Sequence, residues 1–377
     1  MTRVTRMLAA LALASLSCAG GAPAVPDAAP LTPLAQELEV VRAAHGLPSL
    51  AGAVVTSDGL IALDAVGVRK LGDPTPVTRD DVWHLGSDTK AMTATLIALA
   101  VKDGTLRWDT TMAEAFPAEA ASFAPAYRGV TVEMLLDHRG GAPAAVPSDI
   151  WSDMWKPGDP RAQRRAAVIA MLQRAPETPP GTAFVYANAG YMMAGAALED
   201  AAGASWDDLM RARIFAPLAM ASCGFGPPAS PGRVDQPWGH TSAGVPVDPA
   251  GGVADNPPSL GPAGTVHCSM TDWGKFVTAH LRGARGLTTP LGLDATEFAR
   301  LHTPPAGADY AFGWVVTTRP WADGTTFTHS GSNTMFYVTG WIAPARDRAF
   351  LAATNIGGDA AAAGVDAAFG PLIAGFN

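Results

Sequence analysis

Short runs rich in apolar and β-branched residues occur near both ends of the chain. Near the start, residues 50–56 and 60–66 form two such runs, separated by Ser57-Asp58-Gly59, a sequence typical of a hairpin turn. Near the end we expect further strands at residues 310–316, 325–329, 337–342 and 349–354. The pattern therefore predicts a sheet to which both ends of the chain contribute strands.

Helical periodicity precedes, separates and follows these strands. Thr32-Pro33 opens the first helix, with Thr as N-cap and Pro as the first helical residue, and His45-Gly46 ends it. Near the C-terminus, the Ala-rich residues 360–369 predict a helix that should end at the Gly-Pro pair that follows. The long central stretch shows helical spacing of apolar residues at 91–102, 132–137, 161–174, 189–202 and 206–215.

Strands at both ends with helices between them predict an α+β fold. We expect one antiparallel sheet flanked by N- and C-terminal helices, with a mainly helical domain inserted. Residues 1–30 are interpreted as a signal peptide and tether, and residues 31–377 as one domain. Within it, the sheet part should comprise about residues 31–82 with 305–377, and the helical part about residues 83–304.

The composition supports a globular protein and argues against nucleic acid as a partner. The chain has 377 residues, of which 48% are hydrophobic, and this is enough to bury a sizeable core. Its 40 Gly and 32 Pro are scattered without a repeat period, which indicates loops rather than a fibrous or disordered chain. The net charge is −8 and the basic residues form no run, so we expect no nucleic-acid partner.

The N-terminus has the features of an export signal. Arg3 and Arg6 precede an apolar stretch at residues 7–16, which is too short to span a bilayer. Ser15-Leu16-Ser17-Cys18 resembles a bacterial lipobox, in which Cys18 would be lipidated and attach the protein to a membrane. Ala22-Pro23-Ala24 is the competing site for ordinary cleavage. Both alternatives predict an exported protein, either periplasmic or a membrane-anchored lipoprotein.

The three cysteines do not have the paired spacing of a metal site, and we expect no metal or other cofactor. In an oxidising compartment, Cys223 and Cys268 are candidates for a disulfide, and two small buried thiols are the alternative.

The first candidate for chemistry is Ser87-Asp88-Thr89-Lys90, which leads into the apolar residues 91–102. If Ser87 begins a helix, Lys90 lies one turn later on the same face, within reach of the serine oxygen. A serine hydroxyl becomes a good nucleophile when a neighbouring base takes its proton, and a buried lysine can be that base once its pKa falls. Ser-x-x-Lys alone also arises by chance.

Two further motifs make the pattern specific. Residues 82–90, continued by 99–106, resemble the nucleophile helix of the class C β-lactamase family, which also includes DD-peptidases, D-amino-acid amidases and esterases. The Tyr-x-Asn motif of that family corresponds to Tyr186-Ala187-Asn188, and its Lys/His-x-Gly motif to His329-Ser330-Gly331. Residues 135–141 and Phe312-Gly313-Trp314 resemble further landmarks, so the resemblance covers about residues 34–356.

The resemblance implies a β-lactamase/transpeptidase-like fold, in which the antiparallel sheet is five-stranded, and it implies a role for each motif residue. Ser87 would attack a carbonyl group, Lys90 would accept its proton, and Tyr186 would relay that proton to the leaving group. Asn188 would orient the substrate or the lysine. The backbone N–H groups of Ser87 and Ser332 would form an oxyanion hole.

His329 and Gly331 would contribute to substrate binding beside Ser332. β-Lactamases and D-alanyl peptidases of this family mostly carry lysine where this chain has His329. A largely neutral histidine anchors a carboxylate weakly, which favours an ester or amide substrate without a free carboxylate. His84 and His138 flank motifs and are interpreted as structural.

The sequence thus predicts an exported serine hydrolase that acts on a small molecule and cleaves an ester or amide through an acyl-serine, with a β-lactam as the alternative substrate. Two alternatives stay open: a β-lactamase or D-alanyl peptidase acting on cell-wall peptides, and a non-catalytic cell-wall-binding lipoprotein. The Gly-x-Ser-x-Gly elbow of α/β-hydrolases is absent, as are His-Glu-x-x-His, a P-loop and a dinucleotide-binding Gly-x-Gly-x-x-Gly motif.

Overall fold

The computed structural model of the protein describes residues 31–376. The predicted signal, the tether and Cys18 lie outside the described residues. Within residues 31–376, no helix combines the length and the apolar character that crossing a membrane requires.

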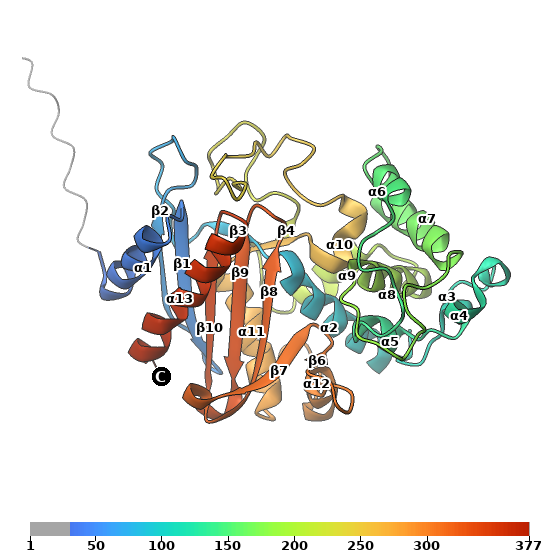
Figure 1. Cartoon of the computed structure of the whole chain (residues 1–377). Coiled ribbons are helices and arrows are strands. Elements are labelled where there is room, and N and C mark those ends of the chain that lie inside the picture. Colours follow the sequence, from blue (N-terminus) through green and yellow to red (C-terminus); the bar gives the residue numbers. More distant parts are fainter. Residues whose placement is uncertain (1–30, 377) are drawn as a thin grey trace, which may run out of the picture. The chain divides into compact units, whose positions relative to one another are not determined.

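The main sheet is antiparallel and has seven strands, in the order β2-β1-β10-β9-β8-β7-β6 (Figure 1). Strands from the two ends of the chain are neighbours within the sheet, where Ala51 of β1 pairs with Ala353 of β10. The predicted α+β class and antiparallel sheet are therefore confirmed. The strands are β1 (Ser49–Thr56), β2 (Gly59–Gly67), β6 (Tyr310–Ala311), β7 (Trp314–Arg319), β8 (Gly324–Ser332), β9 (Tyr337–Ala343) and β10 (Arg348–Thr354).

The predicted count of five strands is wrong. Part of the reason is that residues 310–316, expected as one strand, contain a tight turn. Phe312 and Gly313 both have positive φ, +47° and +94°, and the chain folds back so that Tyr310 of β6 pairs with Val315 of β7. Two consecutive residues of positive φ are typical of a two-residue hairpin turn.

Helices cover both faces of this sheet (Figure 1). The terminal helices α1 (Pro33–Ala44) and α13 (Asp359–Phe376) pack together on one face. The prediction that the last helix stops at Gly370-Pro371 is wrong, because α13 continues through Pro371. Leu372 is fully buried beside Leu38, and both side chains face Gly52 of β1. We attribute the continuation to this packing, which offsets the backbone hydrogen bond that proline cannot make.

The opposite face is covered by α11 (Met270–Ala284), a helix that the sequence prediction does not include. The side chain of Ser269 caps it by accepting a hydrogen bond from the Asp272 N–H, and Trp273, Phe276 and Val277 are buried. This helix falls in the range expected for the helical part, yet it packs on the sheet.

The remaining helices, among them α2 (Thr89–Lys102), lie beside the sheet (Figure 1). All residues of α2 from Thr89 to Ala100 are buried, as expected for a helix that is apolar on every side. The other helices are α3 (Met112–Ala115), α4 (Pro125–Arg128), α5 (Val132–Leu136), α6 (Ser148–Met154), α7 (Pro160–Leu172), α8 (Asn188–Ala202), α9 (Trp206–Met210), α10 (Gly261–Gly264) and α12 (Ala295–His302).

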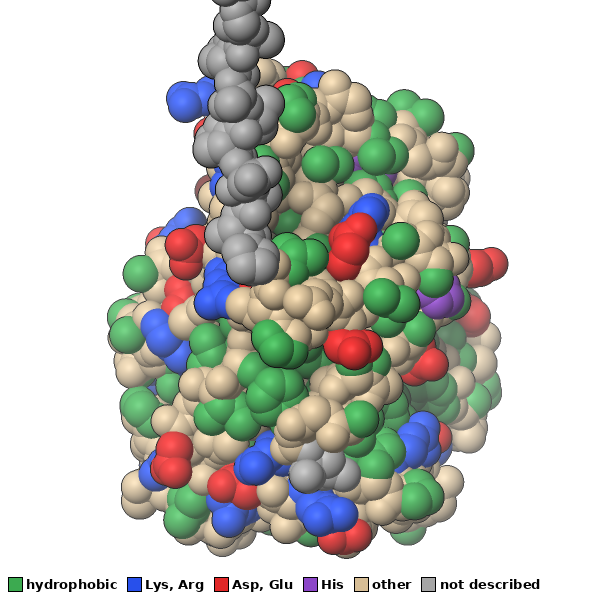
Figure 2. All heavy atoms as spheres, turned by 90° about the vertical axis from the view of Figure 1, so that its left-hand side faces the viewer, with side chains coloured by type: hydrophobic (Ala, Val, Ile, Leu, Met, Phe, Trp, Pro, Cys, Tyr) green, Lys and Arg blue, Asp and Glu red, His purple; other side chains and the backbone are tan. Residues whose placement is uncertain are grey.

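A second, three-stranded sheet of β3 (Val82–His84), β5 (Val266–Ser269) and β4 (Gly224–Phe225) leads the chain into α2. A disulfide joins Cys223, which directly precedes β4, to Cys268 of β5, so the disulfide alternative holds and the two free thiols do not. On the surface seen in Figure 2, basic and acidic side chains are intermixed with apolar ones.

Candidate active site

Ser87 lies in a short 3-10 turn, Gly86–Asp88, between β3 and α2. Ser87 is partly exposed, whereas all the remaining residues from 83 to 100 are buried. Gly86 adopts φ +49°, a conformation that favours glycine, and a Cβ there would collide with the backbone N of Ser332. The turn therefore presses against β8 and presents one hydroxyl group at the surface.

The amino group of Lys90 is held by three oxygen atoms. It donates to Ser87 Oγ at 2.9 Å, to Asn188 Oδ1 at 2.8 Å and to the backbone carbonyl of Ala263 at 2.8 Å. Lys90 is fully buried, and this burial lowers its pKa to about 7, against a smaller opposing effect of the Asp88 carboxyl.

This arrangement decides where a neutral Lys90 would direct its lone pair. The oxygens of Ala263 and Asn188 can only accept hydrogen bonds, so they retain the two N–H groups of a neutral amine. The remaining position faces Ser87 Oγ, whose hydroxyl can donate. A neutral Lys90 is thus oriented to take a proton from Ser87.

Tyr186 and Asn188 enter the site from the segment that begins α8. Tyr186 is 38% exposed at the rim, and the Lys90 Nζ lies 4.8 Å from the centre of its ring. Burial of the hydroxyl end raises the pKa of Tyr186, although the interaction with the Ser87 side chain opposes this shift. His138 Nδ1 accepts the Ala187 N–H at 3.0 Å and so holds the Tyr-x-Asn segment.

His329 on β8 is buried, with only 6% of its surface exposed. Its Nδ1–H donates to the Ser330 carbonyl at 2.8 Å, and its Nε2 therefore accepts from the Tyr310 hydroxyl at 3.2 Å. Burial, with a smaller contribution from the Lys90 charge, lowers the pKa of His329 to about 3. Both ring nitrogens thus already have partners within the protein.

Gly331 and Ser332, the other two residues predicted for substrate binding, lie where β8 meets the Gly86–Asp88 turn, here called the nucleophile turn. A Cβ at Gly331 would stand 2.9 Å from the backbone N of Ser87. The side chain of Ser332 turns away into its own loop, where Oγ donates to the Phe336 carbonyl at 2.6 Å. The structure therefore brings all seven predicted residues to one place.

Two participants have no counterpart in the sequence prediction. The Ala263 carbonyl is a backbone atom of α10, so no residue type signals it. Tyr310, 3% exposed, contacts His329 and stands just before the Phe-Gly-Trp landmark, which was the available signal. Within residues 31–376 no group of three or more His, Cys, Asp or Glu side chains could hold a metal ion.

The sequence matches the Beta-lactamase family over residues 34–374. It is 32% identical to penicillin-binding protein 4 of Amycolatopsis lactamdurans over 247 residues, covering 65% of this chain and 62% of that protein. It is 29% identical to lovastatin esterase of Penicillium rubens over 181 residues, covering 43% and 45% of the two chains.

Among solved structures, the octameric penicillin-binding protein homologue from Pyrococcus abyssi superimposes with a TM-score of 0.70 at 20% identity. That match covers 91% of this chain and 77% of the other. The chain belongs to the β-lactamase family, whose homologues include penicillin-binding proteins, esterases and carboxypeptidase-like proteins and are serine hydrolases. It spans less than two thirds of the length of the penicillin-binding protein and of the esterase.

Proposed function

We propose that the protein is an exported serine hydrolase that cleaves an ester or amide through an acyl-serine intermediate. One observation carries the proposal: a buried lysine of lowered pKa, held by two acceptor-only oxygens, directs its third position at Ser87. A purely structural lysine gains little from burial next to a serine hydroxyl, whereas a general base needs both features.

The reaction then follows from the contacts. Ser87 Oγ bonds to the substrate carbonyl carbon while its proton passes to Lys90 Nζ. The carbonyl oxygen becomes an oxyanion, and the backbone N–H groups of Ser87 and Ser332 are our candidates to stabilise it. The bond to the leaving group breaks as that group takes a proton through Tyr186, whose raised pKa keeps it protonated. Water, deprotonated by the same groups, finally attacks the acyl carbon and releases Ser87.

Substrate choice is inferred from His329. A neutral, buried histidine with both nitrogens engaged offers no cation to a substrate carboxylate. We therefore favour esters or amides without a free carboxylate near the scissile bond, and the similarity to an esterase supports this choice. Activity on β-lactams or D-alanyl peptides is the second candidate, favoured by the similarity to penicillin-binding protein 4.

Export is part of the proposal and rests on the N-terminal sequence. The mature chain is expected to begin at Cys18 carrying lipid, or near Val25 without lipid. Mass spectrometry of the protein from its native host distinguishes the two, and an intact Met1 would remove the signal from the proposal.

A fluorophosphonate probe tests the proposed chemistry directly, because it reacts with an activated serine. We expect one adduct, on Ser87, and none in Ser87→Ala. Ser152→Ala, which removes an exposed serine of α6, is the matched control and should label normally. No adduct on the folded wild-type protein would instead support the non-catalytic cell-wall-binding alternative.

A further inference from the structure

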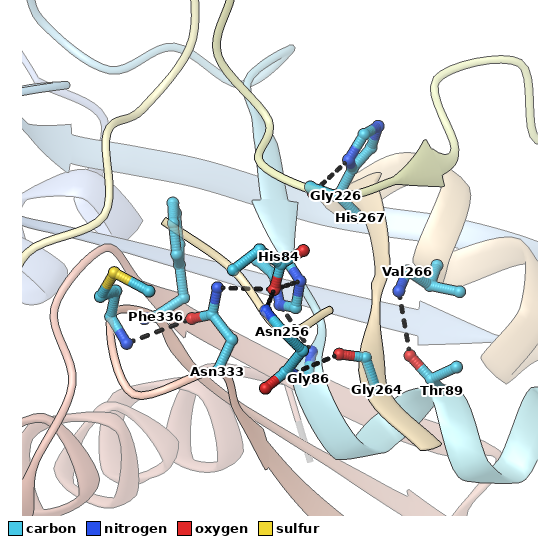
Figure 3. Close-up of polar contacts among 12 residues, drawn as sticks. His84, Gly86, Thr89, Gly226, Asn256, Gly264, Val266, His267, Asn333 and Phe336 are labelled. Carbon is cyan, nitrogen blue, oxygen red and sulfur yellow. Dashed lines mark hydrogen bonds and ion pairs between the residues drawn. The ribbon is translucent and has the colours of Figure 1, made fainter. Parts of the chain in front are cut away.

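His84, at the end of β3, fixes the backbone next to the candidate nucleophile. It is fully buried, and its Nδ1 accepts the Gly86 N–H at 3.0 Å (Figure 3). Because Nδ1 accepts this hydrogen bond, the ring proton of a neutral His84 is on Nε2. Nε2 in turn lies 2.8 Å from Asp255 Oδ1, at ion-pair distance but too obliquely for a well-aligned hydrogen bond.

The same carboxyl oxygen contacts the end of β8. Asn333 Nδ2 donates to Asp255 Oδ1 at 3.2 Å, and Asn333 directly follows Ser332 in the chain. Asn333 is itself fixed, since its Oδ1 accepts the N–H groups of Met335 and Phe336 at 3.1 and 3.0 Å. The Asp255 carboxyl group therefore connects both segments that supply the candidate oxyanion-hole N–H groups.

Asn256, which follows Asp255 in the chain, reaches the lysine side of the site. Asn256 Nδ2 donates to the Gly264 carbonyl at 2.9 Å (Figure 3). Gly264 follows Ala263, whose carbonyl accepts from Lys90. Both Asp255 and Asn256 lie in the long connection between β4 and α10, yet Asp255 has a side chain only 6% exposed.

We propose that Asp255 and Asn256 are positioning residues, which together set the spacing between the nucleophile turn, the end of β8 and the Lys90 acceptor. The inference rests on the proposed function. An oxyanion hole depends on two donors being held at the right distance from the developing charge, and small displacements reduce the rate strongly. Segments joined through one buried carboxyl group should lose that spacing when the group is changed.

Asp255→Asn tests the proposal, because it keeps the size of the side chain and an Oδ1 acceptor but removes the carboxylate charge, so that the contacts of Oδ1 with His84 and Asn333 should weaken. We expect kcat for an ester substrate to fall by about tenfold or more, with KM changed less than about threefold, since the interaction matters most in the transition state. Asp248→Asn is the matched control. Asp248 lies in the same connection, is exposed and bonds only backbone N–H groups of Gly232 and Ala250, so its variant should behave as wild type.

Asn333→Asp provides a second variant. It keeps the Oδ1 acceptor for Met335 and Phe336 but places a carboxylate against Asp255. Asn333→Asp should lower kcat in the same way. Misfolding of the connection between β4 and α10 in the Asp255 variant would not explain a loss of kcat in this second variant. Active-site titration with the fluorophosphonate probe corrects kcat for any unfolded fraction in each variant.

Amide hydrogen exchange of Gly86, followed by NMR, reads the same contact without any catalysis. The Gly86 N–H should exchange faster in Asp255→Asn than in wild type or Asp248→Asn, because a neutral amide oxygen holds His84 more weakly than a carboxylate oxygen does. Wild-type kcat together with unchanged Gly86 exchange in Asp255→Asn would overturn the proposal. If the wild-type protein hydrolyses nothing and takes no label, the proposed function fails, and the Gly86 exchange still decides whether Asp255 holds the turn.

Discussion

Gly331 on β8 lies against the backbone of Leu85, so closely that any side chain at Gly331 would overlap the Leu85 carbonyl oxygen. The same Cβ would stand 2.9 Å from the backbone N atoms of Ser87 and Asp88. Backbone atoms cannot rotate aside as a flexible side chain can, so the third position of His329-Ser330-Gly331 must be glycine for the strand to reach the nucleophile turn.

Gly331→Ala should therefore force β8 away from Ser87. We expect a loss of activity of about a hundredfold or more and destabilisation of about 1–3 kcal/mol from overpacking. Gly129→Ala is the control, because nothing lies within 4 Å of a Cβ at that position and its φ is −94°. Hydrolysis rates and urea unfolding measure both effects, and an active, stable Gly331→Ala protein would contradict this account.

Lys90 should give the enzyme an acidic limb near neutral pH. Burial lowers the pKa of Lys90 to about 7, and only the neutral amine can accept the Ser87 proton. As pH falls through about 7, Lys90 becomes protonated and kcat/KM should decrease, approaching tenfold per pH unit well below that value. Kinetics between about pH 5.5 and pH 9 check this. A flat profile across neutral pH would exclude Lys90 as the base.

Lys90 and Tyr186 are expected to act as one proton-transfer unit with Ser87. Lys90→Met and Tyr186→Phe should each reduce kcat by orders of magnitude, and the double variant should be little worse than either. The double-mutant cycle measures this from four rates, those of the wild type, the two single variants and the double variant, and circular dichroism checks that each protein is folded. Simple additivity of the two losses would show that the residues act independently.

His329 should stay neutral through the range in which a free histidine titrates. Because burial lowers its pKa to about 3, its charge does not change between about pH 5.5 and pH 8. We expect hydrolysis of short-chain nitrophenyl esters, slow or undetectable turnover of cephalosporins, and no contribution of His329 to the pH dependence of their ratio. Efficient cephalosporin turnover at pH 8 would refute the anchoring argument.

Acid should destabilise the fold through buried histidines. Thr95 Oγ donates to the Ala91 carbonyl and accepts from His280 Nε2 at 3.0 Å, while His280 Nδ1 accepts from His302 at 2.9 Å. Burial lowers the pKa of His302 to about 3 and that of His280 well below its ordinary value.

These rings stay neutral in the fold while their unfolded counterparts take up protons below about pH 6.5. The unfolding free energy should therefore decrease as the pH is lowered below about 6.5, by up to about 1.4 kcal/mol per pH unit for each such histidine. Urea unfolding at a series of pH values measures the slope, and His302→Phe should reduce it. An unchanged slope in that variant would show that His302 does not contribute.

The sequence by itself determined what depends on a few neighbouring residues. Thr32-Pro33 begins α1, Ser57-Asp58-Gly59 joins β1 to β2, and the i,i+3 spacing brings Lys90 to Ser87. Capping, turn formation and helix periodicity act over one or two turns of chain, so residue order is sufficient to predict them. The order of the three motifs likewise indicated the family.

Only the tertiary structure decided the contacts between distant segments. It continued α13 through Pro371 by burying Leu372, and it placed the Ala263 carbonyl on Lys90 and Asp255 between His84 and Asn333. It also buried His329 against Tyr310. The sequence predicted a histidine that is largely uncharged at neutral pH, and burial lowers its pKa so far that it stays neutral well into the acid range. The hydrogen bond from Lys90 to the Ala263 carbonyl, for example, joins residues 173 positions apart. Burial and pKa depend on which segments the whole fold packs together, and local sequence patterns do not encode that arrangement.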